Sequence, residues 1–450
     1  MITTINPYND KELQQYQELT KKEIKAKLKT AQKSFEDWRE TSFEQRAKHM
    51  RHVGELLREN KESYAKLITQ EMGKPISQSR GELEKCAGLC DHYAAKAPEY
   101  LAKEYIQTEY FKSYVSYEPI GVVLAVMPWN FPFWQIFRFI VPALMAGNVG
   151  VLKHASNVMG CAELIESIFL KAGFPLGCFQ NLVISSDEVE AIIKNKTIKA
   201  VTLTGSKPAG AAVAAIAGKQ IKKVVLELGG NNALVVFKDA DIEDAVQKCI
   251  EARFHNTGQS CIAGKRLLLQ EEIAEEFLDK FTQKVKVLVS GDPLEEDTYI
   301  GVMAREDLAE ELEDLMNASI DKGAELHCGG SRDKTYFAPT ILINVTSDMP
   351  VFKKETFGPL IAVTTFKTEE EAIKLVNNSK FGLGASLFSA DLEKMEVLAA
   401  QIKDGAVFIN HKVASHPALP FGGTGISGYG RELSYYGIRE FVNIKTVVIA

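Results

Sequence analysis

From residue 120 onward, short apolar runs that suit buried strands alternate with amphipathic segments that suit helices, and the connections between them are short. Parallel strands need a crossover connection, usually a helix, so this alternation is typical of βαβ units in a parallel sheet. The strands predicted in the first part of this stretch are Ile120–Met127, Val149–Lys153, Asn181–Ile184, Ala200–Thr204 and Lys223–Leu228. The predicted helices between them include Cys161–Ala172 and Pro208–Ala217.

The same alternation resumes after residue 229. Its predicted strands are Ala233–Phe237, Arg266–Gln270, Ala385–Phe388 and Ala406–Asn410, and its predicted helices lie near Asp241–Asn256 and Ile273–Val289. The first hundred residues are predicted to be helical, because apolar residues recur at spacings of three and four, as in Ile24, Leu28, Ala31, Phe35 and Trp38. The sequence therefore predicts an α/β fold with two domains joined near residue 229.

Two β-rich segments stand outside this pattern. Tyr110–Tyr117 lies between the predicted helices and the first buried strand, and Phe441–Ile449 ends the chain. Exposed strands aggregate unless their edges are paired. We therefore expect these segments to pair with each other or with another subunit.

Composition excludes several classes of protein. The formal net charge of −6 gives no basic footprint for nucleic acid, and no apolar run reaches the roughly 18 residues of a membrane span. The opening residues lack the pattern of a signal peptide. The seven cysteines show no paired metal-ligand spacing, so we expect a cytoplasmic protein with free thiols and no metal site.

Two reactive groups lie beside polar or glycine-rich turns. Cys261 ends the stretch Asn256–Cys261, and a cysteine in such a loop can expose a nucleophilic sulfur. Glu227 ends an apolar strand before Gly229 and Gly230, where burial favours a general base. Taken alone, an arbitrary cysteine is more often a small buried side chain, and the glutamate is equally compatible with a structural carboxylate that binds backbone amides.

Three turns after predicted strands suit anionic or polar ligands. Asn130, within Met127–Pro132, can donate to a developing oxyanion or form a structural turn. Lys153 can bind ribose or phosphate or stay solvated. Gly205 and Ser206 precede a predicted helix whose free amides suit a phosphate, although an ordinary capped turn fits the same residues.

Read together, these motifs resemble the aldehyde dehydrogenase superfamily over essentially the whole chain. The shared motifs are Pro128–Pro132, Lys153, Thr204–Ser206, Glu227–Gly230, Gly258–Cys261, Glu355–Pro359 and Pro420–Gly423. Within the superfamily the chain is most similar to bacterial succinate-semialdehyde dehydrogenases, through Trp129–Arg138, Lys153–Ala155 and Gly428–Glu432.

The resemblance implies a Rossmann-like cofactor domain over 1–108 and 119–228, an α/β catalytic domain over 229–428 and a small β oligomerisation element over 109–118 and 429–450. It implies a homodimer or homotetramer. In catalysis, it implies that Cys261 is the nucleophile, Asn130 an oxyanion donor and Glu227 the base. The cofactor residues that it implies are Trp129, Lys153, Gly205, Ser206, Glu355 and Phe357.

Departures from the family pattern concern cofactor and substrate. Ser156 replaces a glutamate of many NAD-preferring relatives, so we expect NADP to be accepted and NAD to be the alternative. Arg138 matches an arginine that grips the substrate carboxylate in some relatives, although a salt bridge within the protein is the other interpretation. Ser415 is a second candidate contact, and His255 replaces a further arginine.

The predicted reaction is oxidation of a small aldehyde, succinate semialdehyde, through a thiohemiacetal and a thioester on Cys261. A dehydrogenase of broad aliphatic or other semialdehyde specificity is the alternative. An inactive homologue with a binding or structural role is disfavoured, because the thiol, the carboxylate and the amide are all retained.

Overall fold

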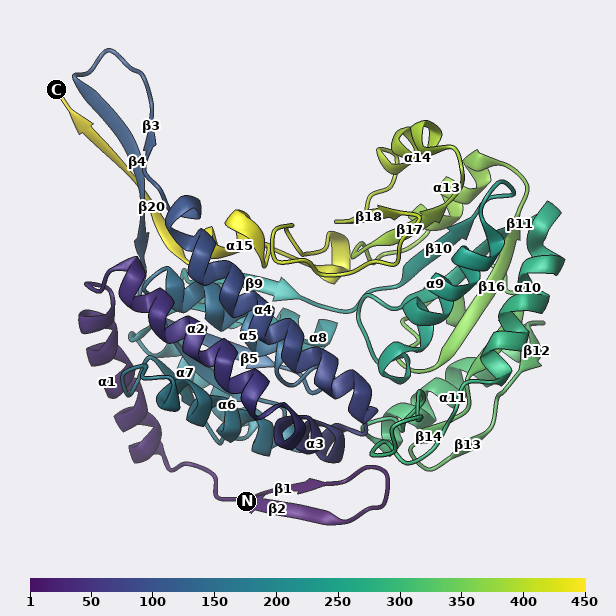
Figure 1. Ribbon diagram of the computed structural model, residues 1–450, viewed down its shortest axis with the longest axis horizontal. Coiled ribbons are helices and arrows are strands. Elements are labelled where there is room, and N and C mark those ends of the chain that lie inside the picture. The colour runs from purple at the N-terminus through teal and green to yellow at the C-terminus, as the bar shows by residue number, and fades with distance from the viewer.

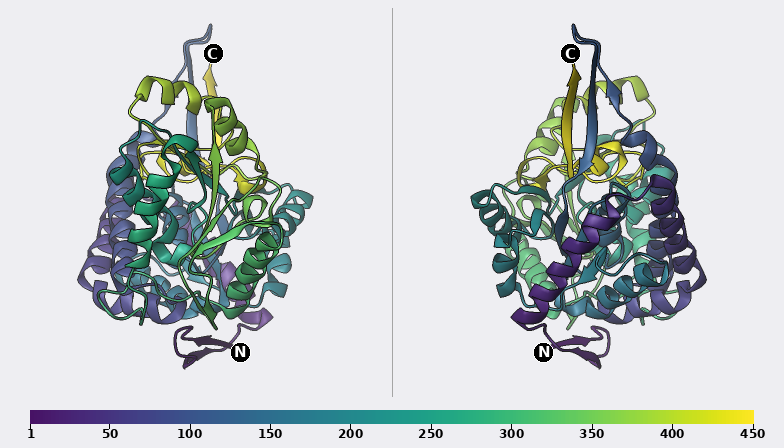
Figure 2. Two further views of the ribbon diagram at one scale, coloured as in Figure 1. Left: turned by 90° about the vertical axis from the view of Figure 1, so that its right-hand side faces the viewer. Right: turned by 90° about the vertical axis from the view of Figure 1, so that its left-hand side faces the viewer.

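The computed structural model describes residues 1–450 as two α/β bodies with a β-stranded arm projecting from the first (Figure 1). The first body contains the helices and strands up to β9 and also receives the C-terminal strand β19. The second body runs from β10 to β18. In both side views the arm extends beyond the bodies, at the opposite end from the N-terminal hairpin (Figure 2).

The first body is built on a six-stranded sheet with the order β19-β9-β8-β5-β6-β7. All neighbours are parallel except β19, which is antiparallel to β9. Its strands are β5 (Val122–Met127), β6 (Val149–His154), β7 (Phe179–Asn181), β8 (Ile198–Thr204), β9 (Lys223–Glu227) and β19 (Gly428–Tyr429). Because the carboxyl ends of parallel strands share one edge, the turns after β5, β6, β8 and β9 lie together there.

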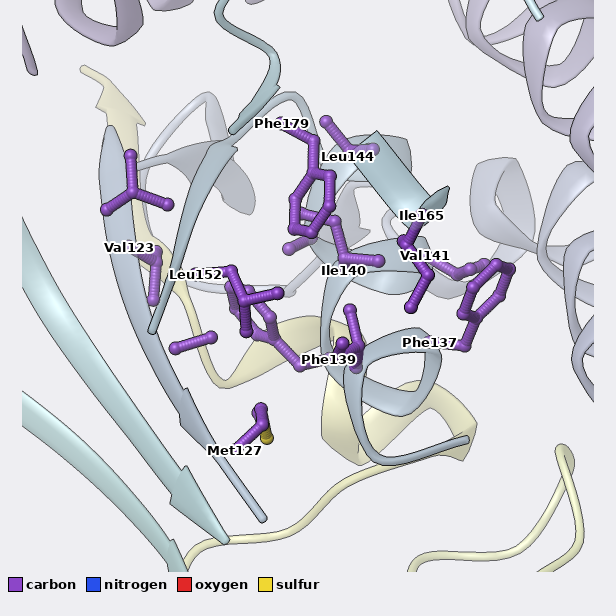
Figure 3. Packing of buried hydrophobic residues seen from close by; sticks show 14 of the residues in the cluster. Val123, Met127, Phe137, Phe139, Ile140, Val141, Leu144, Leu152, Ile165 and Phe179 are labelled. Atoms are coloured by element: carbon purple, nitrogen blue, oxygen red, sulfur yellow. The ribbon is translucent and has the colours of Figure 1, made fainter. Parts of the chain in front are cut away.

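The helices of the first body are α1 (Lys21–Trp38), α2 (Phe43–Glu59), α3 (Lys61–Met72), α4 (Ile76–Tyr100), α5 (Trp134–Met145), α6 (Met159–Lys171), α7 (Val189–Lys194), α8 (Lys207–Lys219) and, near the C-terminus, α15 (Ser434–Arg439). Helix α5 is buried along its whole length. Figure 3 shows its residues Ile140 and Leu144 on the side of the sheet residues Leu152 and Phe179, while Phe137 lies on the other side of the helix, towards Ile165 of α6.

The second body has a seven-stranded sheet with the order β12-β15-β16-β11-β10-β17-β18, parallel except for β12. Its strands are β10 (Asn232–Val236), β11 (Gly264–Gln270), β12 (Glu325–Cys328), β15 (Thr340–Ile343), β16 (Leu360–Phe366), β17 (Ala385–Phe388) and β18 (Val407–Ile409). Its helices are α9 (Ile242–Phe254), α10 (Glu271–Lys286), α11 (Glu306–Ile320), α12 (Pro350–Lys353), α13 (Glu369–Asn377) and α14 (Leu392–Ala399), and a small hairpin joins β13 (Arg332–Asp333) to β14 (Tyr336–Phe337).

The arm consists of β3 (Glu104–Tyr105), β4 (Lys112–Pro119) and β20 (Val442–Ile449). Strand β20 pairs with β4 in antiparallel register, from Val442 opposite Pro119 to Ile449 opposite Lys112. The expectation that the two β-rich segments pair with each other is therefore confirmed, with the first strand starting two residues later than the predicted segment.

Most of the predicted α/β elements are present, and three differences have physical reasons. The strand predicted at Asn181–Ile184 lies earlier in the chain, because β7 spans Phe179–Asn181. The sheet does not continue to Val183, whose carbonyl oxygen accepts a hydrogen bond from the Leu19 amide instead. The opening residues form a hairpin of β1 (Ile2–Ile5) and β2 (Glu12–Tyr16). These two strands were not predicted, because their segments are too short and too polar to show a strand pattern in the sequence. Helix α5 was not predicted, because it is mostly apolar and its polar residues Gln135 and Arg138 are buried with the rest, so no exposed polar face marks it as a surface helix.

None of the helices combines the length and the apolar composition that crossing a membrane requires.

Candidate active site

The thiol of Cys261 lies at the end of a strained turn that follows helix α9 of the second body. Helix α9 stops at Phe254, earlier than the predicted Asn256, because Asn256 and Thr257 adopt left-handed backbone conformations with φ of 56° and 53°. Gly258 also has positive φ, and a Cβ there would come within 2.4 Å of the Gly358 carbonyl oxygen. The turn therefore requires glycine at this position, and it leaves Cys261 partly exposed.

Asn130 is held against this turn from the end of β5. Its Nδ2 donates to the carbonyl oxygen of Gln259 at 3.1 Å, and its own carbonyl accepts from Asn256 Nδ2 at 2.8 Å. An amide nitrogen carries two hydrogens, so one remains for an acceptor beside the thiol. The sequence prediction that Asn130 and Cys261 belong to one site is consistent with this contact.

Glu227 ends β9 and is 2% exposed, with no hydrogen-bond partner at either carboxylate oxygen. Burial, followed by the negative charge of Glu432, raises its pKa well above the ordinary value, and Arg138 opposes the shift. The backbone around it is tight, because a Cβ on Gly422 would lie 2.9 Å from Glu227 Oε1. A carboxylate of this kind holds a proton readily and suits a general base.

The Cys261 thiol is electrostatically coupled to the same groups. Burial raises its pKa, the cations of Arg138 and Lys265 lower it, and the carboxylates of Glu355 and Glu227 raise it again. The net shift favours the protonated thiol, so attack on a substrate needs removal of that proton.

Lys265 links the thiol turn to Glu355, and the sequence analysis did not identify it. Its fully buried Nζ donates to the carbonyl oxygens of Ser260 at 2.8 Å and Cys261 at 2.7 Å, and lies 3.0 Å from a Glu355 oxygen. Glu355 also accepts from the Gly230 amide at 3.0 Å. The signal that could have revealed Lys265 is a lysine inside the apolar strand β11, since a buried lysine needs polar partners.

Phe357 and Trp129 meet nearby, with ring centroids 5.7 Å apart and planes at 88°. Phe357 follows Glu355 by two residues, and Trp129 precedes Asn130. The residues expected from the sequence to surround a nicotinamide are therefore close to the residues expected to perform the chemistry.

The edge formed by β6 and β8 carries the remaining predicted cofactor residues. Lys153 lies near the end of β6 without an ion-pair partner, and burial lowers its pKa. Ser206 occupies the N-cap position of α8, but its side chain makes no capping hydrogen bond, so the first-turn amides are free for an anion. Gly205 precedes it, and Ser156 is exposed at the start of a 3-10 turn, Ser156–Val158. These residues fit a dinucleotide.

A cavity of about 420 Å³ opens beside Cys261. Helix α4 contributes Gln78, Glu82 and Lys85, which lie on one face of the helix because they are four and three residues apart. Glu82 accepts hydrogen bonds from the backbone amides of Phe133 and Trp134, which start α5. This contact fixes the helix that brings Arg138 to the cavity wall.

Arg138 is placed both to face a substrate in the cavity and to form a salt bridge within the protein, the two interpretations that the sequence left open. Its side chain lines the cavity and packs 4.5 Å from the Phe421 ring, but its Nε also lies 2.8 Å from a Glu432 oxygen. His255 also lines the cavity and stacks on Phe131, and burial lowers its pKa to about 3, so it is neutral. Ser415 lines the cavity as well.

Comparisons with known proteins agree along the whole chain. A model of the aldehyde dehydrogenase family matches residues 1–447. A probable succinate-semialdehyde dehydrogenase (NADP(+)) of Synechocystis is 46% identical over 452 residues, covering 100% of both chains. A succinate semialdehyde dehydrogenase (NAD(P)+) of Escherichia coli is 44% identical, covering 99% of this chain and 97% of its own. The crystal structure of a Streptococcus pyogenes succinic semialdehyde dehydrogenase in complex with NADP+ has a TM-score of 0.98 at 36% identity, with full coverage of both chains.

Proposed function

The chain belongs to the aldehyde dehydrogenase family, and from this premise we propose that it oxidises succinate semialdehyde to succinate with NADP or NAD. The observation that carries the proposal is the cavity beside Cys261, which is lined by the cationic side chains of Lys85, Arg138 and Lys412. Such a wall favours an aldehyde with a distal carboxylate over an uncharged one.

In the proposed reaction the Cys261 sulfur loses its proton to solvent and forms a bond to the aldehyde carbon. The uncommitted N–H of Asn130 and the Cys261 amide donate to the oxygen that becomes negative, and they stabilise the thiohemiacetal anion. A dinucleotide held by Lys153, Ser206 and Glu355 would supply the acceptor for the hydride that leaves this carbon. The product on the enzyme is a thioester.

Hydrolysis of the thioester then needs an activated water. As the oxygen of this water bonds to the thioester carbonyl carbon, Glu227 takes a proton from the water. The carbon–sulfur bond then breaks and releases succinate and the Cys261 thiolate. The raised pKa of Glu227 supports this role, because a carboxylate with a raised pKa is a stronger base and accepts a proton from water more readily.

For the dinucleotide we propose contacts from Lys153, Gly205 and Ser206 to its phosphate and ribose groups, and from Trp129, Glu355 and Phe357 near its nicotinamide end. Ser156 presents a hydroxyl where a carboxylate would repel a 2′-phosphate, which supports use of NADP. The names of the Synechocystis and Escherichia coli relatives, which include NADP(+) and NAD(P)+, also support it.

Kinetics with a substrate panel test the proposal. Initial rates are compared for succinate semialdehyde, glutarate semialdehyde and butanal, each with NADP and with NAD. We expect kcat/KM for succinate semialdehyde to exceed that for butanal by at least tenfold, and NADP to support turnover. Equal efficiency on all three aldehydes would favour the broad-specificity alternative, and no reduced cofactor with any of them would contradict the function.

We also propose a homodimer or homotetramer assembled through the arm. Large apolar side chains are exposed there, including Phe111 at 85% and Ile444 at 61%. Light scattering should give a mass of two or four chains, and an Ile444→Asp variant should shift toward a lower mass.

A cytoplasmic location is supported by seven unpaired cysteines, which suit a reducing compartment.

A further inference from the structure

Four of the five ammonium or guanidinium groups in and beside the cavity have a carboxylate partner in the protein. Arg138 lies 2.8 Å from Glu432, Lys412 lies 2.7 Å from Glu251, Lys265 lies 3.0 Å from Glu355, and Lys74 forms a buried ion pair with Glu82. The fifth cation is Lys85 of α4, and no carboxylate lies within ion-pair distance of its Nζ. It is therefore the one cation of the cavity wall whose charge the chain leaves unmatched.

The surroundings of Lys85 hold its ammonium group in place without neutralising it. Its Nζ donates to Ser415 Oγ at 2.7 Å and lies 4.2 Å from the centre of the Trp134 ring. Because an ammonium group has three hydrogens, further donors remain. The Ser415 hydroxyl accepts from Lys85 and donates to no other group of the chain, so its hydrogen is also free for an acceptor in the cavity.

We propose that Lys85 determines substrate specificity by binding the distal carboxylate of the aldehyde, together with the hydroxyl of Ser415. This inference rests on the proposed oxidation of an aldehyde that carries a carboxylate. It assigns the main charge contact to Lys85 rather than to Arg138, whose charge is matched by Glu432, and it leaves Arg138 as a supporting cation in the wall.

The electrostatics of the cavity agree with this assignment. Burial, helped by the neighbouring cations of Arg138 and Lys412, lowers the pKa of Lys85 to about 8, while Cys86 and Glu82 oppose the shift. A carboxylate bound at Nζ would restore the charged form, because opposite charges stabilise each other at low dielectric. Affinity for the acidic aldehyde should therefore decline as the pH rises above about 8, whereas affinity for an uncharged aldehyde should not.

The test compares Lys85→Met and Lys85→Arg with the wild type. The measured quantity is the ratio of kcat/KM for succinate semialdehyde to that for butanal, at pH 7. Removing a charge-assisted contact should lower this ratio by at least about tenfold in Lys85→Met, mainly through KM. Lys85→Arg keeps the charge and should recover at least part of the ratio. Succinate should also inhibit butanal oxidation at least about tenfold less effectively in Lys85→Met.

Lys96→Met is the matched control, because it removes a lysine of the same helix α4 that is exposed, pairs with Glu99 and lies outside the cavity, and its ratio should stay within about twofold of the wild type. Thermal unfolding checks the fold of each variant, and Lys85→Gln replaces any Met variant that does not fold. An unchanged ratio and unchanged inhibition in the Lys85 variant would overturn the inference. If the wild type does not prefer succinate semialdehyde to butanal, the proposed substrate is wrong. The role of Lys85 is then decided by the ratio of kcat/KM for glutarate semialdehyde to that for butanal in the wild type and in Lys85→Met.

Discussion

Arg138 and Glu432 form an ion pair at 2.8 Å in which both side chains are at least nine-tenths buried. The arginine comes from α5 in the first body, and the glutamate comes from the C-terminal segment that returns to it after β18. Burial raises the pKa of Glu432, and Arg138 opposes this shift. The pair therefore connects the stability of the C-terminal segment to the charge of the cavity.

The first prediction concerns this pair. Arg138→Met leaves a buried carboxylate without its cation, which typically costs about 3–5 kcal/mol. We expect a lower thermal midpoint in this variant. The double variant Arg138→Met/Glu432→Leu removes both charges and should recover most of the loss, because a buried pair replaced by apolar groups is often nearly neutral. An Arg138→Met variant as stable as the wild type would contradict the assignment of Arg138 and Glu432 as a buried ion pair.

The second prediction concerns Asn130. Asn130→Ala should lower kcat by about 100- to 1000-fold, the usual effect of losing one oxyanion donor. The comparison is Asn317→Ala, an exposed asparagine on α11, which should leave kcat unchanged. Because Asn130 also holds the thiol turn through Gln259, the reaction of Cys261 with iodoacetamide is measured in parallel. An unaltered kcat would remove Asn130 from the oxyanion site.

The sequence predicted the parallel sheets because most strands are short apolar runs and the predicted crossover helices have a 3.6-residue period, although the crossover helix α5 was not among them. Cys261, Glu227 and Asn130 could be proposed because each lies in or beside a distinctive turn at the end of a strand or helix. Their proximity depends on sheet order, since β5 and β9 are separated by β8 in the sheet and the thiol turn comes from the other body.

Lys85, Lys265 and Glu432 could not be found in the same way. Lys85 lies in a helix rich in charged residues, where a lysine usually faces solvent, and only the packing of α4 against α5 places it in the cavity. Glu432 was part of a motif, but its partner Arg138 is almost 300 residues earlier. Long-range ion pairs of this kind have no local spacing that a sequence reveals.

The third prediction separates the two halves of the reaction. Glu227→Gln removes the base for hydrolysis and leaves Cys261 in place. Rapid mixing should show a burst of about one reduced cofactor per active site, followed by turnover at least about 100-fold slower than in the wild type. Loss of the burst together with turnover would instead assign Glu227 to activation of the thiol.

The pH dependence of hydrolysis is expected to follow Glu227. Burial and Glu432 raise its pKa, and only the deprotonated form accepts a proton from water. The steady-state rate of the wild type should therefore rise with pH through this raised pKa and level off above it. The Glu227→Gln variant should lose this limb of the profile; a limb retained in the variant would mean that another group titrates.

The last prediction concerns the choice of dinucleotide. Ser156→Glu would place a carboxylate where we propose that the adenosine ribose binds. Two like charges at about 4 Å repel by up to about 4 kcal/mol at an effective dielectric near 20, and solvent weakens this at an exposed residue. We expect kcat/KM with NADP to fall by at least about tenfold, while NAD is affected less, because it lacks the 2′-phosphate. Ser331→Glu adds the same charge to an exposed position in the second body and should leave the ratio of the two cofactors unchanged. If Ser156→Glu lowers both cofactors equally, residue 156 lies in the binding region without sensing the phosphate, and the basis for NADP use must be sought in Lys153 instead.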